Sequence, residues 1–338
     1  MLSIKKSFSL SLLGSALLAS FSFNGMAADT SAIAGASVER IHGEQQQMDF
    51  SQQKRVTALH IAQQYQQLKP LLATQITSEN KSLNLQALNQ SKKLDLSEFK
   101  QFQSSVVRAK GYAVNTDDLV EIRLAYDSML EALQNGVAPL FAFEPAGDEK
   151  QWQYIEAFDS EGDTHLLDVH NLPKRPVMVV DINAKSDLKA GLGLMREVFA
   201  AFSGTTVTSL KSEKNVNSAL TQTASTDVLE TSVLKKVSLK DDEEPWISGD
   251  AEIYGIVNGV DASRDEPILD VVDMPYLDDE DTTYSPNQIV IFWARYRWSA
   301  ADMILMEHDD NTNYKDLAIA LAEAAGAIMA VIPDPTTQ

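Results

Sequence analysis

The chain contains no cysteine among its 338 residues. This absence excludes disulfide bonds, a thiol nucleophile and the lipid-modified cysteine of a lipoprotein. A chain of this length without disulfides must be stabilised by its own hydrophobic core or by bound ions. Because hydrophobic residues make up 44% of the sequence, a substantial core is expected.

Positive charge is also scarce. The chain has 28 Lys and Arg residues against 48 Asp and Glu residues, which gives a formal net charge of -20. Such a chain is not expected to bind nucleic acid, or an anionic membrane surface unless a cation bridges the two. Residues 241–281 hold fifteen acidic residues and one basic residue, Arg264. This uneven distribution indicates that the charged residues most relevant to function lie in the C-terminal half.

The sequence lacks the common motifs of hydrolases and nucleotide-binding proteins. Its five histidines show no HExxH spacing, and neither a GxSxG motif nor a P-loop occurs. A zinc hydrolase, an α/β-hydrolase and a P-loop nucleotidase are therefore disfavoured. A hydrolase that uses two carboxyl groups remains open, because two of the 48 acidic residues are enough for that chemistry.

The first 27 residues have the pattern of a secretory signal peptide. Lys5 and Lys6 precede an apolar run over residues 8–23, and small residues stand at Gly25 and Ala27. A membrane anchor is the alternative, but the apolar run is short and polar sequence follows it. We therefore predict cleavage after Ala27, a periplasmic or secreted protein, and no integral membrane span.

The rest of the chain predicts an α+β protein with two domains. Residues 28–49 are read as a flexible leader, and residues 50–204 as an α+β domain. Residues 205–233 contain twelve Ser or Thr residues among 29 and are read as a linker, the alternative being an exposed loop within one domain. Residues 234–335 are expected to form a small acidic β-sandwich with a terminal helix packed on it.

Apolar spacing predicts the elements of the first domain. A first helix is expected from about Asp49, with Ile61, Tyr65 and Leu68 on one face and Pro70 at its end. Further helices are expected over residues 116–134, with Thr116 as the cap, and over residues 186–202. Short apolar or alternating runs predict strands at residues 139–145, 153–159, 165–170 and 177–182.

Similar apolar patterns occur in the second domain. Strands are predicted at residues 232–239, 251–260, 289–298 and 302–306, with a long acidic loop over residues 261–288. The final run from Lys315 predicts a helix that ends at Pro333.

Acidic stretches beside the predicted strands suggest a calcium site, because Ca²⁺ takes six to eight oxygen ligands. An EF-hand is excluded: Asp309 fits the first ligand position, but Tyr314 stands where the glycine belongs and Ala320 where the glutamate belongs. A site assembled from several loops is expected instead, with a solvated acidic surface as the alternative. The candidate ligands are Asp250, Asp278, Asp281, Glu307, Asp309 and Asp310.

His308 lies between Glu307 and Asp309, which suggests acid–base chemistry. Neighbouring side chains of a strand point to opposite faces, so adjacency alone gives no catalytic pair. We expect a structural histidine at the end of a strand. A secreted hydrolase that uses a pair of carboxylates, or a histidine and a carboxylate, is kept as an alternative function.

The predicted strand 289–298 places Trp293, Arg295 and Arg297 on one face. Aromatic and guanidinium planes stack on sugar rings, so a carbohydrate-binding module is another alternative. In the contrary interpretation, the aromatic residues of the strand are core residues and the arginines pair with the acidic loops.

Three stretches carry a resemblance: EEPWISGDAEIYGIVNGV, DMPYLDDEDTTYSPNQIVIFW and MEHDDNTNYKDL. They resemble a family of uncharacterised secreted proteins of marine gammaproteobacteria, which implies export and no established activity. The last third of the chain is also similar to C2-like calcium-binding β-sandwiches, although its acidic spacing differs from a standard C2 loop. Together these observations predict an exported Ca²⁺-binding recognition or structural module, with a glycan or a protein as its partner.

Overall fold

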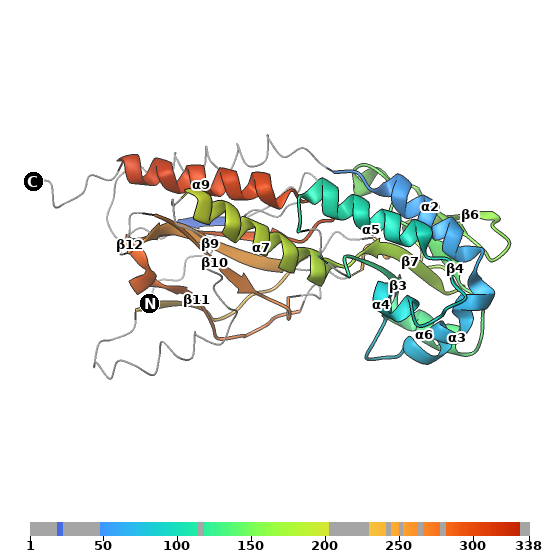
Figure 1. Cartoon of the computed structure of the whole chain (residues 1–338). Helices are drawn as coiled ribbons and strands as arrows, with labels where there is room; N and C mark the ends of the chain where they lie inside the picture. The colour runs from blue at the N-terminus through green and yellow to red at the C-terminus, as the bar shows by residue number, and fades with distance from the viewer. Residues whose placement is uncertain are drawn as a thin grey trace, which may run out of the picture.

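The computed structural model describes residues 19–22, 48–113, 116, 118–202, 230–240, 245–249, 253–262, 266–277 and 282–331. Figure 1 shows an elongated molecule with one sheet at each end. Helices and strands are mixed throughout, which confirms the predicted α+β class. The division into a leader, two domains and a linker stays a prediction.

A six-stranded sheet forms one end of the molecule. Its order is β2 (Ser82–Asn84), β3 (Val120–Leu124), β7 (Val177–Ile182), β4 (Leu140–Ala142), β5 (Tyr154–Phe158) and β6 (Thr164–Asp168). Strands β4 and β7 pair in parallel, and the other neighbours pair antiparallel. The strands predicted within residues 139–182 are all present.

Two long helices, α2 (Ser51–Ala62) and α5 (Ser97–Lys110), pack against this sheet and against each other (Figure 1). Shorter helices are α3 (Tyr65–Gln75), α4 (Leu85–Leu88) and α6 (Leu130–Gln134), with 3₁₀ turns η1 (Asp127–Met129) and η2 (Glu149–Gln151). Pro70 lies inside α3, so the prediction that it ends the helix was wrong. The break occurs earlier, between α2 and α3.

The helix predicted over residues 116–134 is wrong in its first half, which forms strand β3. Apolar residues at 119, 122 and 126 suit one face of a helix. However, Val120, Ile122 and Leu124 also alternate with charged residues, which is the pattern of a strand. Strand β3 gains two partners, β2 and β7, and becomes an interior strand. Its alternation places Glu121 and Arg123 together on the face opposite to Ile122.

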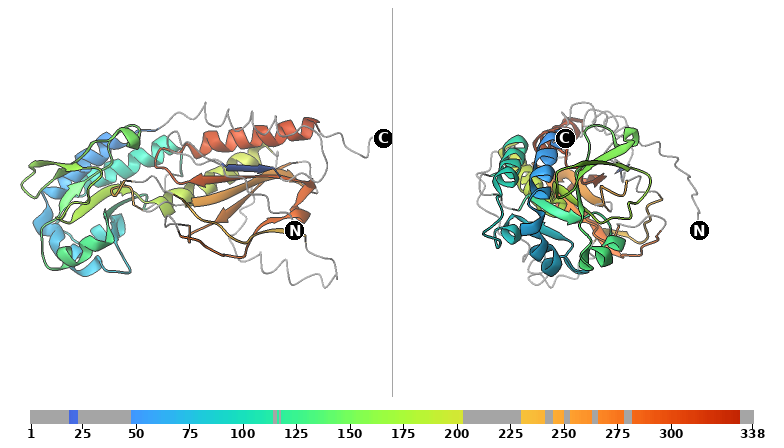
Figure 2. Two further views of the ribbon diagram at one scale, coloured as in Figure 1. Left: turned by 180° about the vertical axis from the view of Figure 1, so that it is seen from behind. Right: turned by 90° about the vertical axis from the view of Figure 1, so that its right-hand side faces the viewer.

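A four-stranded antiparallel sheet forms the other end of the molecule. Its order is β1 (Ala19–Ser22), β12 (Tyr296–Glu307), β9 (Ile253–Asp261) and β10 (Pro267–Asp273). Figures 1 and 2 show α7 (Ala184–Phe202) and α9 (Tyr314–Val331) side by side along this sheet. Strands β8 (Thr231–Leu234) and β11 (Gln288–Phe292) form a separate ribbon, and a second apolar cluster joins residues of this ribbon to the sheet.

Two expectations for this end of the chain were wrong. The segment predicted as an acidic loop over residues 261–288 contains strand β10. The strand predicted over residues 289–298 is interrupted by the 3₁₀ turn η3 (Trp293–Arg295). Trp293 and Arg295 therefore lie in a turn, whereas Arg297 lies in β12, and the three do not share one strand face.

Helices α7 and α9 approach each other closely at one glycine. A Cβ atom added to Gly191 would lie 2.3 Å from the ring of Tyr314, so no other residue fits there without a shift. Tyr314 is buried at the start of α9. Within the described residues, no helix is both long enough and apolar enough to cross a membrane.

Candidate functional site

The candidate site lies at the carboxyl ends of the parallel strands β4 and β7. Glu144 follows β4 by two residues, and Asp181 is the penultimate residue of β7. Asp181 also pairs across the sheet with Glu121 of β3. Adjacent parallel strands end at the same edge of a sheet, so Glu144 and Asp181 lie close together although they are far apart in sequence.

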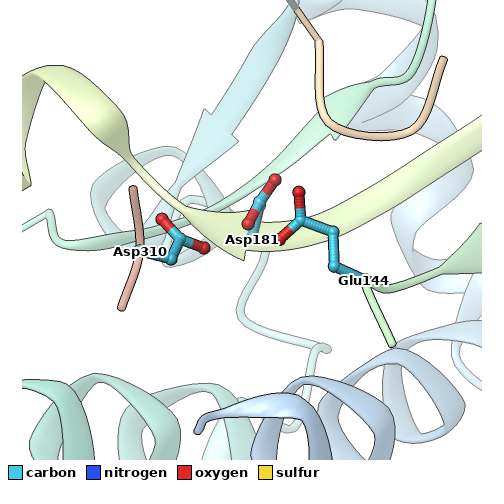
Figure 3. Close-up of side chains that lie close together, drawn as sticks. All are labelled: Glu144, Asp181 and Asp310. Carbon is cyan, nitrogen blue, oxygen red and sulfur yellow. The ribbon is translucent and has the colours of Figure 1, made fainter. Parts of the chain in front are cut away.

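The third carboxyl group comes from the opposite end of the chain. Asp310 lies in the turn between β12 and α9, and one carboxyl oxygen each from Glu144, Asp181 and Asp310 lie within 4.8 Å of one another. Figure 3 shows the three side chains with their carboxyl groups turned toward each other. Three segments of the fold therefore converge on a single point.

Lys54 of α2 is in contact with all three carboxyl groups. Its Nζ lies 2.8 Å from Asp181 Oδ1 and 2.5 Å from Asp310 Oδ2, and it also pairs with Glu144 Oε2. The side chain of Lys54 is only 4% exposed, so these carboxyl groups replace most of the water that an ammonium ion requires. Lys54 thereby connects the helical layer, the six-stranded sheet and the turn before α9.

Arg123 of β3 binds the other oxygen of Asp181. Its Nε and Nη2 atoms donate to Asp181 Oδ2 at 2.9 and 2.6 Å. Nη2 also donates to the carbonyl oxygens of Ile247 and Ser248, at 2.5 and 3.0 Å. Residues 245–249 therefore lie against the polar face of the sheet, and Asp181 is bound by two cations.

The two aspartates of the cluster hold their protons very differently. Burial favours the neutral form of Asp181, but Lys54, Arg123 and a hydrogen bond from Asp310 hold its pKa well below the usual value. Burial raises the pKa of Asp310 well above the usual value, and the charges of Asp181 and Glu144 raise it further against the opposing effect of Lys54. The surroundings therefore favour the neutral form of Asp310 and the ionised form of Asp181.

Burial and nearby charges also shift the pKa values of the neighbouring groups. Burial and the charge of Asp181 raise the pKa of Glu144, and burial raises the pKa of Glu121. Burial lowers the pKa of Lys54, but Asp181, Asp310 and Glu144 outweigh burial and hold that pKa well above its usual value. Lys54 is therefore a permanent cation in the cluster.

The cluster opens into a cleft with a volume of about 510 Å³. Nine Asp or Glu residues line it, against two permanent cations, Lys54 and Arg123, together with His308. The acidic residues are Asp49, Glu121, Glu144, Asp148, Glu149, Asp181, Glu307, Asp309 and Asp310. Both cations already bind carboxyl groups, so the cleft carries a surplus of negative charge.

Glu149 lies in the 3₁₀ turn η2 on the wall of this cleft and is half-buried. Burial raises its pKa to about 7, with further contributions from the charges of Asp309, Glu144 and Asp148. A carboxyl group with this pKa exchanges protons near neutral pH, as general acid–base catalysis requires.

A second polar cluster, which we call the Asp187 network, is buried next to the cleft. Asp187 of α7 accepts hydrogen bonds from Lys110 Nζ at 2.6 Å, His308 Nε2 at 2.9 Å and the Tyr112 hydroxyl at 2.8 Å. Burial opposes ionisation of Asp187, but His308 and Lys110 hold its pKa below the usual value. In this network each charge has a direct partner.

Of the predicted calcium ligands, Glu307, Asp309 and Asp310 line the cleft, and Asp310 belongs to the carboxyl cluster. Asp250, Asp278 and Asp281 lie outside the described residues, so their part in a site stays a prediction. His308 follows β12 directly, is buried and pairs with Asp187, in agreement with the expected structural histidine at a strand end.

The predicted glycan-binding residues have other contacts. Trp293 Nε1 donates to Ser232 Oγ at 3.2 Å, and Arg295 Nη1 lies 2.5 Å from Asp270 Oδ1. The pairing of Arg295 agrees with the interpretation that the arginines neutralise acidic segments. Glycan binding by Trp293, Arg295 and Arg297 stays a prediction.

Sequence reasoning missed Lys54, Glu121, Arg123, Glu144 and Asp181. Asp181 had a usable signal, because it is a charged residue inside the apolar run VMVVDI. Glu121 and Arg123 were hidden by the wrong helix prediction, which placed them on a solvent face. Lys54 had no signal, since it lies among ordinary polar residues of a helix.

The comparisons with known proteins give one match. No curated protein and no solved structure matches the chain significantly. A family model described as "Protein of unknown function (DUF3103)" matches residues 54–338, a range that includes every residue of the carboxyl cluster and of the Asp187 network. The chain therefore belongs to the DUF3103 family of proteins of unknown function.

Proposed function

We propose that the cleft is the active centre of a hydrolase that works by general acid–base catalysis. The observation that carries this proposal is the convergence of Asp310, Asp181 and Glu144 in one solvent-accessible cleft, where the pKa of Asp310 is raised and that of Asp181 is lowered. Environments that push the pKa values of neighbouring carboxyl groups apart are typical of catalytic acid–base pairs.

The residues would divide the reaction between them. Glu149, ionised in half of the molecules near pH 7, takes a proton from a water molecule as its oxygen attacks the substrate. Asp310 donates its proton to the leaving group, which departs as the bond to it breaks. Asp181, fixed by Lys54 and Arg123, supplies the negative charge that keeps Asp310 protonated until that moment.

The charge of the cleft supports a cationic substrate. Nine acidic side chains face two cations, and both cations are bound to carboxyl groups. A cleft lined by charges of one sign concentrates ligands of the opposite sign and speeds their arrival. The substrate in this proposal therefore carries amino or guanidino groups close to the bond that is hydrolysed.

The test is a hydrolysis screen with purified protein on glycosides, peptides and esters, each in a cationic and an anionic version. We expect turnover of a cationic substrate, and a loss of about 100-fold or more in kcat for Asp310→Asn and for Glu149→Gln. Asp127→Asn is the matched control, because Asp127 is exposed and forms its ion pair with Lys81, outside the cleft. Turnover that survives both cleft substitutions would contradict the assignment.

Binding of Ca²⁺ is a second candidate function, supported by the three carboxyl oxygens within 4.8 Å of one another. Glu307 and Asp309 line the same cleft and would add oxygen ligands. The ammonium group of Lys54 contacts all three carboxyl groups, so a cation at this point must displace it. The ion would then hold the turn before α9 against the sheet.

Calorimetry with CaCl₂ tests this second candidate, together with thermal melts with and without a chelator. Lys54→Met removes the competing ammonium group, so it should bind Ca²⁺ more tightly than the unmodified chain. Lys81→Met, which changes an exposed lysine, should not alter binding. No heat of binding in either the unmodified chain or Lys54→Met would exclude a calcium site in the cleft.

A further inference from the structure

The Asp187 network lies where three parts of the fold meet. Lys110 ends helix α5, Asp187 lies in the first turn of α7, and His308 follows strand β12. Figure 1 shows the end of α5 close to the start of α9, and Lys110 Nζ lies 5.7 Å from the centre of the Tyr314 ring at the start of α9. Asp187 and Lys110 have fully buried side chains, and that of His308 is 3% exposed.

One hydrogen bond joins this network to the segment that carries Asp310. An ionised carboxylate only accepts hydrogen bonds, so the nitrogen of His308 that faces Asp187, Nε2, is the one that carries a proton. His308 stands two residues before Asp310, whose carboxyl group contacts Lys54 in the cleft. The position of His308 therefore limits where Asp310 can lie.

The short segment between the two residues has little freedom. Asp309 Oδ1 accepts from the backbone N–H of Asn311 at 2.7 Å, and the Asp309 carbonyl accepts from the N–H of Thr312 at 2.9 Å. Helix α9 starts at Tyr314, immediately after this turn. A displacement of His308 is thus transmitted to Asp310 through a closed turn and is not absorbed by a flexible loop.

We propose that Asp187 is a positioning residue for the acid–base cleft, because through His308 it sets the distance between Asp310 and Lys54. This inference rests on the proposed function for its catalytic consequence, but its geometric part stands without that function. Displacement of a reacting group by about 1 Å can reduce turnover by about 100-fold, so such a residue acts on catalysis without touching the substrate.

Two variants of similar size separate the hydrogen bond from the packing. His308→Met removes the donor to Asp187, whereas His308→Gln keeps an N–H group in reach of the same carboxylate. The buried ammonium group of Lys54 gives the readout, because the NMR signal of its Nζ depends on the contact with Asp310. We expect His308→Met to shift this signal and His308→Gln to restore it.

Tyr112→Phe is the control within the network. It removes the hydroxyl bond to Asp187 but leaves the bond between Asp187 and His308 in place. It should lower the melting temperature and leave the Lys54 signal unchanged. A purely structural network would instead move the Lys54 signal equally in Tyr112→Phe and His308→Met, or in neither, and either result would overturn the inference.

The failure of this inference is distinguishable from failure of the proposed hydrolase. If a substrate is found, His308→Met should lower kcat by about 10-fold to 100-fold with little change in KM, and His308→Gln should recover most of the rate. If no substrate is found, the Lys54 signal still decides the geometric claim.

If His308→Met does not fold, Asp187→Glu replaces it. The longer side chain pushes His308 and must also shift the Lys54 signal. An unchanged signal overturns the proposal.

Discussion

The carboxyl cluster of the cleft and the Asp187 network use the same kinds of side chain and differ in charge balance. In the Asp187 network, one carboxylate binds one lysine, a histidine and a hydroxyl group, and all of these residues are buried. In the cleft, carboxyl groups outnumber cations, and the site opens into a cavity of about 510 Å³. The network balances its charges, whereas the cleft is lined by more carboxyl groups than cations.

The difference has a consequence for pH dependence. Asp187 has a lowered pKa in the folded chain, so it contributes stability above its unfolded pKa, and this stability is lost as the pH falls. Glu144, Glu149 and Asp310 have raised pKa values, so the folded chain binds their protons more tightly than the unfolded chain does. Their contribution to stability falls as the pH rises, which is the opposite sign.

The largest loss of stability should follow from breaking the balanced network. Lys110→Met leaves the Asp187 carboxylate buried without its cation, and the removal of one partner of a buried pair costs about 3–5 kcal/mol. Urea unfolding at neutral pH measures the loss. Lys81→Met is the control and should cost less than about 1 kcal/mol, because its pair with Asp127 is exposed. Equal losses in both variants would contradict the comparison.

A smaller loss is expected from the same substitution in the cleft. Lys54→Met removes a cation from three carboxyl groups, but these groups can take up protons and are in reach of water. We expect a loss on the order of 2 kcal/mol at neutral pH, with a smaller loss at acidic pH, where the carboxyl groups are protonated. Urea unfolding at both pH values is the measurement, and a loss that grows on acidification would refute this account of the cluster.

Asp310→Asn should affect stability even less. The folded chain already holds Asp310 in its neutral form, and an amide group has a similar shape and a hydrogen-bond donor that faces Asp181. At neutral pH we expect a change of less than about 1 kcal/mol, whereas Asp181→Asn removes the ion that Lys54 and Arg123 both bind and costs more. Thermal unfolding of the two variants compares them. A greater loss in Asp310→Asn would show that Asp310 is ionised.

Apolar patterns predicted many of the helices and strands, because these patterns depend only on residues that are close in sequence. Strands β4, β5, β6 and β7 each stand out as a short apolar or alternating run, and helices α7 and α9 each show an apolar stripe at helical spacing. The prediction for strand β3 was wrong because its apolar residues fit both the helical period of about 3.6 residues and the strand period of two. Its pairing with β7 decides in favour of the strand. Pairing partners are set by the whole sheet, so no local window contains that information.

The site was harder to predict than the fold. Asp310 was among the predicted ligands because it lies in a visibly acidic segment, but its partners Lys54, Glu144 and Asp181 are 256, 166 and 129 residues away in sequence. Glu144 and Asp181 meet because β4 and β7 are parallel, and a hairpin with a further connection separates these strands in the chain. The sequence pattern contained no signal for that parallel pairing.

The pH dependence of stability is the most selective test of the comparison. Glu149 has a pKa of about 7 in the folded chain against 4.5 as its ordinary value, so the folded form binds the proton more tightly between these two pH values. The free energy of unfolding should therefore decrease as the pH rises through this window. Glu149→Gln cannot titrate, so its stability should fall less steeply over the same range. Glu156→Gln is the control, because Glu156 pairs with Arg55 outside the cleft. If Glu149→Gln and the unmodified chain show the same pH slope, the pKa of Glu149 is not raised in the folded chain, and Glu149 is not the base of the proposed acid–base chemistry.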